Sequence, residues 1–180
     1  MPSLACRLRS SRFILGNHGC NGGSLVKSVQ YFNTIAGRLA TWYTYPFTNG
    51  VRTCRVGASS TITPYRLGTL QYKQIPKGNE NSLMEALKQG PVYVAVNAKA
   101  TAFMSYKSGV INLNAATCSP DKLDHAVTLV GYGRDARTGQ NFWKLKNSWA
   151  TTWGESGYIR LARGNNVCGI ANNAFQIFTV

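Results

Sequence analysis

The apolar residues in the first part of the chain recur at the spacing of helices. Four such residues predict one helix: Leu25, Val29, Phe32 and Ala36. Gly37 is a natural end for this helix. A second helix is predicted over residues 79–89, where Leu83 and Leu87 lie one turn apart and Gly90–Pro91 ends the pattern. Residues 40–70 hold aromatics, Pro and Gly without a stable period, which indicates an irregular packed segment.

The second part of the chain reads as strands. Val92, Val94 and Val96 alternate with other residues, as one face of a strand does. Four further strands are predicted, joined by turns that contain glycine: 125–132, 141–147, 157–163 and 174–179. Helices followed by strands predict an α+β fold with two lobes and a boundary near residues 66–72.

Two polar residues stand at the ends of predicted neighbouring strands. His125 opens an apolar run, and Asn147 closes the next apolar segment. An amide beside an imidazole can hold the ring in one tautomer and one orientation, which a general acid–base requires. Taken alone, His125 could equally be a core histidine whose ring nitrogens are hydrogen-bonded. Trp143 and Trp153 are expected to pack in the core.

Charge and composition narrow the function classes. The formal net charge is +14, which suits either a polyanion partner or a solvated basic surface. No run of Lys and Arg is interleaved with aromatics, so a nucleic-acid partner is not expected. No apolar run has the length of a membrane span, and residues 1–12 lack the apolar core of a signal peptide. Gly131-x-Gly133 has no third glycine and no following helix, which excludes a dinucleotide loop.

The five cysteines favour disulfides over a metal site. They stand at positions 6, 20, 54, 118 and 168, with no C-x-x-C pair among them and only two histidines in the chain. No metal ion is therefore expected. Well-separated cysteines in a chain of this kind suit an oxidising compartment, and an odd number leaves at least one without an intramolecular partner.

Six motifs, in this order, resemble those of a papain-like cysteine peptidase of the cathepsin type. They are Gly19–Cys20–Asn21–Gly22–Gly23, Gly90–Pro91–Val92, Leu123–Asp124–His125–Ala126–Val127 with Gly131–Tyr132–Gly133, Phe142–Trp143–Lys144–Leu145–Lys146–Asn147–Ser148–Trp149, Trp153–Gly154–Glu155–Ser156–Gly157–Tyr158 and Asn166–Val167–Cys168–Gly169–Ile170. The resemblance covers roughly residues 16–180. It implies a partial helical lobe over 16–68 and a β-barrel-like antiparallel lobe over 69–180, after an atypical segment 1–15.

The resemblance also implies roles for individual residues. His125 would be the histidine of a Cys–His–Asn triad, Asn147 would orient its ring, and Trp149 would cover their contact. Gly22 and Gly23 would pair with the backbone of an extended substrate. The walls of an apolar specificity pocket are expected from Leu25, Ala95 and Ala126. No cofactor is implied.

The nucleophile of the family is missing from the 180 residues. It lies in a Cys-Gly-Ser/Ala-Cys-Trp/Tyr motif about 130–150 residues before the histidine, and no such motif occurs here. The neighbours of Cys6 do not match it, so the chain is expected to be truncated at its N-terminus. By resemblance Cys118 pairs with Cys168, Cys20 loses its partner, and Cys6 is the one candidate to pair with Cys54.

These observations predict a papain-like cysteine peptidase that is inactive as this chain alone. Its expected partners are peptide or protein substrates and protein inhibitors, with no nucleic acid and no membrane, and it is expected to be a monomer. The family implies a lysosomal, vacuolar or extracellular location. Two alternatives stay open: a non-catalytic homologue that binds peptides or inhibitors, and a fragment or gene model whose full-length parent is an active enzyme.

Overall fold

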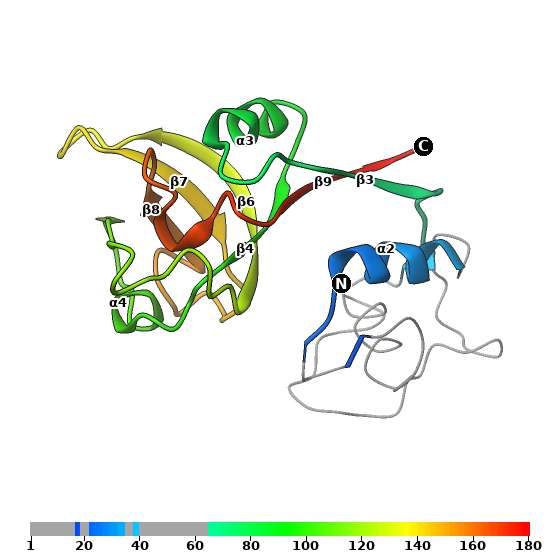
Figure 1. The fold of residues 1–180 in the computed structure, drawn as a ribbon, viewed down its shortest axis with the longest axis horizontal. Helices are drawn as coiled ribbons and strands as arrows, with labels where there is room; N and C mark the ends of the chain where they lie inside the picture. The colour runs from blue at the N-terminus through cyan, green and yellow to red at the C-terminus, as the bar shows by residue number, and fades with distance from the viewer. Residues whose placement is uncertain (1–16, 19–21, 35–37, 40–64) are drawn as a thin grey trace. The chain divides into compact units, whose positions relative to one another are not determined.

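The structure is a computed structural model that describes residues 17–18, 22–34, 38–39 and 65–180. The chain divides into two compact units, one made of Met1–Tyr72 with Phe178–Val180 and one of Lys73–Ile177. Figure 1 shows the helices and strands with their labels. The irregular segment predicted within 40–70 falls largely outside the described residues, as do Cys6, Cys20 and Cys54.

In the first unit, one helix follows the predicted apolar spacing. Helix α2 spans Leu25–Thr34 and buries Val29, Tyr31 and Phe32, which confirms the predicted helix. Residues 35–37, with the predicted stop, lie outside the described residues. Before the helix, the Asn17 side chain accepts a hydrogen bond from the backbone N–H of Ser24 at 2.7 Å. Two short strands, β1 (Arg38–Leu39) and β2 (Tyr65–Arg66), pair antiparallel.

A seven-stranded sheet has the order β3-β9-β4-β6-β7-β8-β5. From β9 through β4, β6 and β7 to β8, each strand pairs antiparallel with the next, whereas β5 runs parallel to β8. The elements from residue 70 onward are β3 (Leu70–Gln74), α3 (Glu80–Leu87), β4 (Val92–Val96), α4 (Thr101–Met104), β5 (Val110–Ile111), β6 (His125–Arg134), β7 (Asn141–Lys146), β8 (Tyr158–Ala162), the 3-10 turn η2 (Val167–Gly169) and β9 (Ala174–Thr179). The predicted strands and the α+β class are confirmed.

Helix α3, Glu80–Leu87, lies within the range 79–89 that the sequence predicts. Asn79 caps its start, because its side chain accepts a hydrogen bond from the backbone N–H of Ser82 at 2.9 Å. Leu83 and Ala86 are buried against the core. Gly90, just beyond the helix, has a φ of +149°, which few residues other than glycine adopt.

Apolar and polar residues alternate along the strands, so the apolar side chains on one face of the sheet lie in the core. On β7, Trp143 and Leu145 are fully buried, whereas Lys144 and Lys146 point to solvent. On β8, Ile159 and Leu161 are also fully buried. Burial of each such side chain contributes about 1.5–3 kcal/mol to folding. Trp143 packs in the core as predicted.

Strand β6 has an irregularity between Leu129 and Gly131 in its pairing with β7. The glycine pair 131 and 133 therefore lies inside a strand and forms no dinucleotide loop, as the sequence predicts. Gly133 is closely packed, since a Cβ there would lie 2.8 Å from the Phe142 ring. Gly131 has open space at the same position.

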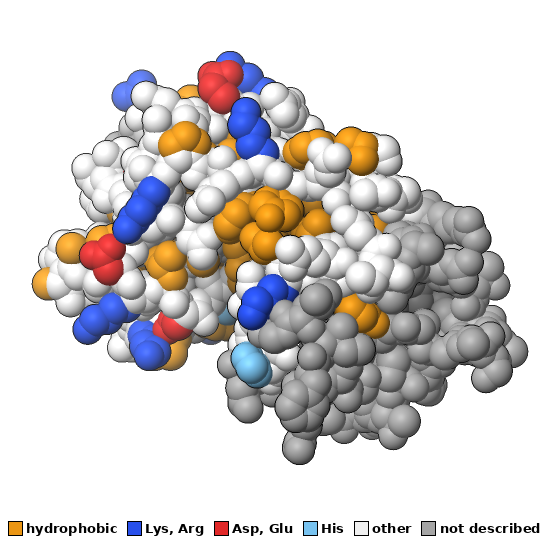
Figure 2. All heavy atoms as spheres, turned by 45° about the vertical axis from the view of Figure 1, so that its right-hand side comes forward, with side chains coloured by type: hydrophobic (Ala, Val, Ile, Leu, Met, Phe, Trp, Pro, Cys, Tyr) orange, Lys and Arg blue, Asp and Glu red, His pale blue; other side chains and the backbone are white. Residues whose placement is uncertain are grey.

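Charged side chains are spread over the face shown in Figure 2, where Lys and Arg appear singly or beside an acidic group. Several acidic residues of the described chain have basic partners, as in Lys88 with Glu85 and Lys99 with Asp124. In the same residues, no helix combines the length and apolar character required to cross a bilayer.

Candidate active site

His125 and Asn147 meet because of how two neighbouring strands are paired. His125 is the first residue of β6, and Asn147 directly follows the last residue of β7, its antiparallel neighbour. The imidazole Nε2 lies 2.8 Å from the amide Oδ1 of Asn147, which is hydrogen-bond distance. The contact predicted from the two sequence positions is therefore present.

A backbone group fixes which atoms of this contact donate and accept. The backbone N–H of Ser148, which can only donate, lies 2.7 Å from Oδ1 of Asn147. The amide oxygen must therefore face both neighbours, and His125 Nε2 donates to it. In the neutral ring, this leaves Nδ1 with a lone pair, free to accept a proton from a reacting group.

Aromatic rings pack beside the imidazole of His125. The ring of Trp149, the residue predicted to cover the His125–Asn147 contact, lies 4.9 Å from the imidazole ring and is tilted by 31° to it. Phe103 meets the imidazole edge-on at 6.4 Å, and Trp153 meets Trp149 edge-on at 5.2 Å. Only 9% of Asn147 is exposed, and a hydrogen bond with little water nearby is electrostatically stronger.

The amide of Asn147 also has an unused donor. Its Nδ2 is buried and has no hydrogen-bond partner within the described part of the chain. A buried N–H without a partner costs about 1–3 kcal/mol. The amide thus keeps its orientation toward His125 and Ser148 although its other end is unpaired.

Asp124 ties the start of β6 to the end of β4. Its Oδ1 accepts a hydrogen bond from the backbone N–H of Ala98 at 2.8 Å, and its own N–H donates to the Val96 carbonyl at 3.1 Å. Val96 is also the residue paired with His125 across the sheet. These bonds fix the backbone from which the imidazole projects.

Predicted substrate-binding residues occur in both units. In the second unit, Ala95 and Ala126 are direct cross-strand partners on β4 and β6. Gly22, Gly23 and Leu25 belong to the first unit. Gly22 has a φ of +100°, and a Cβ added there would meet no atom within 4 Å, whereas a Cβ on Gly23 would lie 2.4 Å from Oδ1 of Asn17.

One disulfide joins Cys118 to Cys168, 50 residues apart in the sequence. This confirms the pairing that the family resemblance implied. It links the segment ahead of His125 to η2. In the described residues, no three His, Cys, Asp or Glu side chains are grouped so that they could hold a metal ion.

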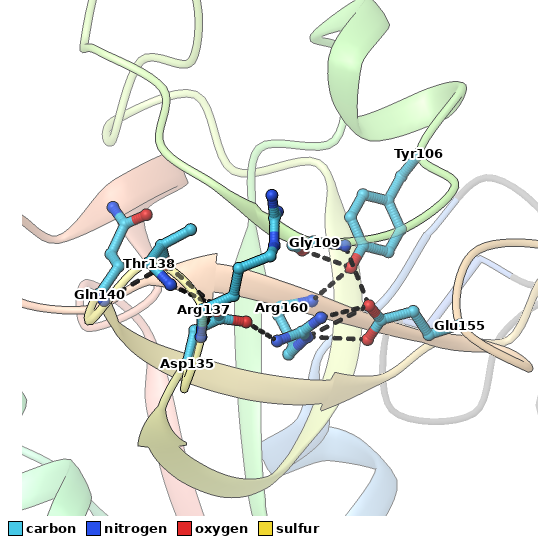
Figure 3. Close-up of polar contacts among 8 residues, drawn as sticks. All are labelled: Tyr106, Gly109, Asp135, Arg137, Thr138, Gln140, Glu155 and Arg160. Carbon is cyan, nitrogen blue, oxygen red and sulfur yellow. Dashed lines mark hydrogen bonds and ion pairs between the residues drawn. The ribbon is translucent and has the colours of Figure 1, made fainter.

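The sequence motifs did not reveal the ion-pair network in which Arg160 contacts two acidic residues (Figure 3). Its guanidinium contacts Asp135 at 2.6 Å and Glu155 at 2.6 Å. A hydrogen bond from the Thr138 backbone, followed by those from Arg160, lowers the pKa of Asp135 from 3.8 to about 2. Hydrogen bonds from Arg160 likewise lower the pKa of Glu155. The signal available was Glu155 itself, which lies in a recognised motif but had no assigned role.

Comparison with known proteins agrees with this geometry. The family model described as papain family cysteine protease matches residues 5–178, which begins earlier than the resemblance at residue 16. Digestive cysteine proteinase 1 of Homarus americanus is 44% identical over 160 residues, covering 88% of this chain and 47% of that protein. Cathepsin L of Sarcophaga peregrina is 40% identical over 158 residues, covering 87% of this chain and 44% of that protein.

The fold is also that of a solved relative. The bromelain protease of Ananas comosus, solved in complex with the E64 inhibitor, superposes with a TM-score of 0.80 at 32% identity, covering 99% of this chain and 77% of that one. The chain spans about half the length of the curated relatives it matches. On its sequence match and its fold, the chain belongs to the papain family of cysteine proteases.

Proposed function

We propose that His125 and Asn147 are two members of a Cys–His–Asn triad that hydrolyses peptide bonds. The observation that carries this proposal is the 2.8 Å contact between His125 Nε2 and Asn147 Oδ1, with the amide fixed by the Ser148 N–H. An oriented imidazole beside a nucleophile is the arrangement that activates it. Family membership supplies the reaction class.

In this mechanism His125 works through Nδ1. The ring takes the thiol proton on Nδ1, and the sulfur forms a bond to the peptide carbonyl carbon. Nδ1–H then gives its proton to the leaving amine as the C–N bond breaks, which leaves a thioester on the cysteine. Water hydrolyses this thioester, and Asn147 holds the ring in place throughout.

The 180 residues by themselves are not expected to catalyse this reaction. None of their cysteines stands in the family's nucleophile motif, and Cys118 and Cys168 are joined to each other. Since the members of a triad act as a unit, an oriented histidine without its thiolate gives little acceleration.

Substrate contacts are proposed for the residues that the resemblance assigned. Gly22 and Gly23 pair with the peptide backbone, and Trp149 lies next to the His125 ring. Leu25, Ala95 and Ala126 are each proposed to contact apolar side chains of the substrate. Protein inhibitors of the family are further partners, and the protein acts as a monomer. The disulfide supports a lysosomal, vacuolar or extracellular site of action.

The test is to supply the missing nucleophile. The 180-residue chain is expressed alone and with an N-terminal extension that carries the nucleophile motif of a papain-family relative. Hydrolysis of a fluorogenic peptide with an apolar side chain is expected from the extended chain only. His125→Ala should abolish it and Asn147→Ala should lower it, whereas His18→Ala, at an exposed residue of the first unit, should leave it unchanged.

Three results would each contradict part of the proposal. Hydrolysis by the extended chain that persists in His125→Ala would remove the histidine from the mechanism. Peptide binding without any hydrolysis by a folded extended chain would instead favour a non-catalytic homologue. Labelling of Cys6 by a thiol-directed epoxide in the unextended chain would contradict its proposed inactivity.

A further inference from the structure

The segment between β7 and β8 carries most of the residues around the candidate site. This segment, residues 147–157, is called the 147–157 loop. Its ends are joined by a hydrogen bond from Asn147 N–H to the Gly157 carbonyl at 2.9 Å, and Gly157 N–H donates to the Trp153 carbonyl at 2.8 Å. Asn147, Trp149 and Trp153 therefore move with one short stretch of backbone.

Two residues of the loop have a strained backbone. Ala150 and Ser156 have φ values of 72° and 55°, in the left-handed region that non-glycine residues rarely adopt. Such residues persist only when surrounding contacts hold them, at about 1–3 kcal/mol each. The loop therefore depends on contacts outside itself.

Glu155 supplies charged contacts of this kind (Figure 3). Its carboxylate accepts hydrogen bonds from Arg160 Nη2 at 2.6 Å and from Arg160 Nε at 2.9 Å. The two residues therefore form a bidentate ion pair, and Arg160 belongs to β8. The same carboxylate accepts the backbone N–H of Gly109 at 2.9 Å. One side chain thus joins the 147–157 loop to β8 and to the segment before β5.

Tyr106 continues this connection toward the aromatic rings. Its hydroxyl donates to the Gly109 carbonyl at 2.6 Å, and its ring lies 5.6 Å from that of Trp153. The fit is tight, because a Cβ on Gly154 would lie 2.9 Å from the Tyr106 ring. Trp153 contacts Trp149, and Trp149 contacts His125.

We propose that Glu155 is a positioning residue for the His125–Asn147 pair. It touches neither residue; it acts by holding the 147–157 loop against Gly109 and Arg160, so that Trp153 and Trp149 stay packed over the imidazole. The proposal rests on the proposed function, because the orientation of His125 matters only if the ring transfers a proton. The effect on His125 is nevertheless measurable without any catalysis.

The experiment follows the imidazole of His125 by NMR in the 180-residue chain. The chain has only two histidines, and the His18→Gln variant assigns the other signal. Glu155→Gln keeps the shape of the side chain and removes its charge. We expect exchange of the His125 Nε2–H with water to rise roughly three- to tenfold, the range set by weakening one ordinary hydrogen bond. The tryptophan fluorescence should shift to longer wavelength.

Two control variants separate position from charge. Glu85→Gln removes the same charge from the exposed pair with Lys88, and neither signal should change. Asp135→Asn removes the other ion pair of Arg160 but keeps every contact of Glu155, and it should leave the His125 exchange rate near that of the parent chain. An effect of Asp135→Asn as large as that of Glu155→Gln would overturn the assignment to Glu155.

A purely structural role would give a different result. Glu155→Gln would then lower the unfolding midpoint while the exchange rate of Nε2–H stayed at the parent value, and the proposal would be wrong. If Glu155→Gln does not fold, Tyr106→Phe decides, because it removes only the hydroxyl, which donates to the Gly109 carbonyl and accepts the backbone N–H of Arg160 at 3.3 Å. Faster exchange in Tyr106→Phe supports the proposal and an unchanged rate refutes it. Failure of the triad itself would appear only in the hydrolysis assay.

Discussion

The carboxylate of Glu80 accepts a hydrogen bond from the indole Nε1 of Trp143 at 3.1 Å, although 63 residues separate the two. The same carboxylate also accepts the backbone N–H groups of Gly164, at 2.7 Å, and of Asn166. Glu80 opens α3, Trp143 is the largest fully buried side chain among the described residues, and the two backbone groups belong to the turn after β8. One acidic residue therefore secures three separate segments.

Glu80→Ala is expected to lower the free energy of unfolding by about 2–3 kcal/mol, because it leaves a buried indole N–H and two backbone N–H groups without their acceptor. Urea unfolding followed by tryptophan fluorescence measures the change. Glu85→Ala, on the same helix but exposed, should leave the unfolding midpoint unchanged. Equal midpoints for the two variants would show that the contacts of Glu80 add nothing.

The strand glycines give a second prediction about packing. Gly133→Ala should destabilise the protein by about 1–3 kcal/mol, because the new methyl group would meet the Phe142 ring at 2.8 Å and overpack the site. Gly131→Ala, two residues earlier on the same strand, meets nothing within 4 Å and should cost less. Thermal unfolding of both variants tests this, and the reverse order of stability would contradict the structure.

The Cys118–Cys168 bond should be a major source of stability. Replacing both cysteines by alanine is expected to lower the free energy of unfolding by about 2–5 kcal/mol, because the unfolded chain regains the freedom of a loop of this length. Urea unfolding of the double variant and the parent chain, both without reductant, measures it. Adding reductant should bring the parent chain close to the double variant. An unchanged parent midpoint under full reduction would contradict the prediction.

Acid should weaken the protein partly through Asp135. The folded-state pKa of its carboxyl is about 2, below the ordinary 3.8, so the unfolded chain binds protons more readily. The stabilising effect of Asp135 is therefore complete above about pH 4 and is lost as the pH falls toward 2. The lowered pKa of Glu155 acts in the same direction. Asp135→Asn should flatten the fall of the urea midpoint between about pH 4 and 2, and an unaltered slope would argue against it.

Much of the fold and part of the site could be predicted from the sequence. Apolar spacing located α2, α3 and the main strands, because it reports burial along one element. The contact between His125 and Asn147 followed from their places at the ends of two such strands. Its cover by Trp149 was implied by family resemblance.

The remaining parts depend on contacts between distant segments, which spacing does not report. Phe103 belongs to a helix of only four residues, and nothing in the neighbouring sequence indicates that its ring contacts the imidazole of His125. The strand pattern predicts only that the Arg160 side chain points outward. Its partners Asp135 and Glu155 lie on two different turns. Glu80 reads as an ordinary first-turn acid of a helix.

The bond from Ser148 to Asn147 has a consequence for how the chain tolerates mutation. The donor is a backbone N–H, and the Ser148 residue itself is exposed. Nearly any side chain at position 148 would therefore leave the Asn147 amide facing His125, and this position should be free to vary. Proline is the exception, because it has no N–H to donate. A saturation library at position 148 should thus retain a single imidazole tautomer in every folded variant except Ser148→Pro.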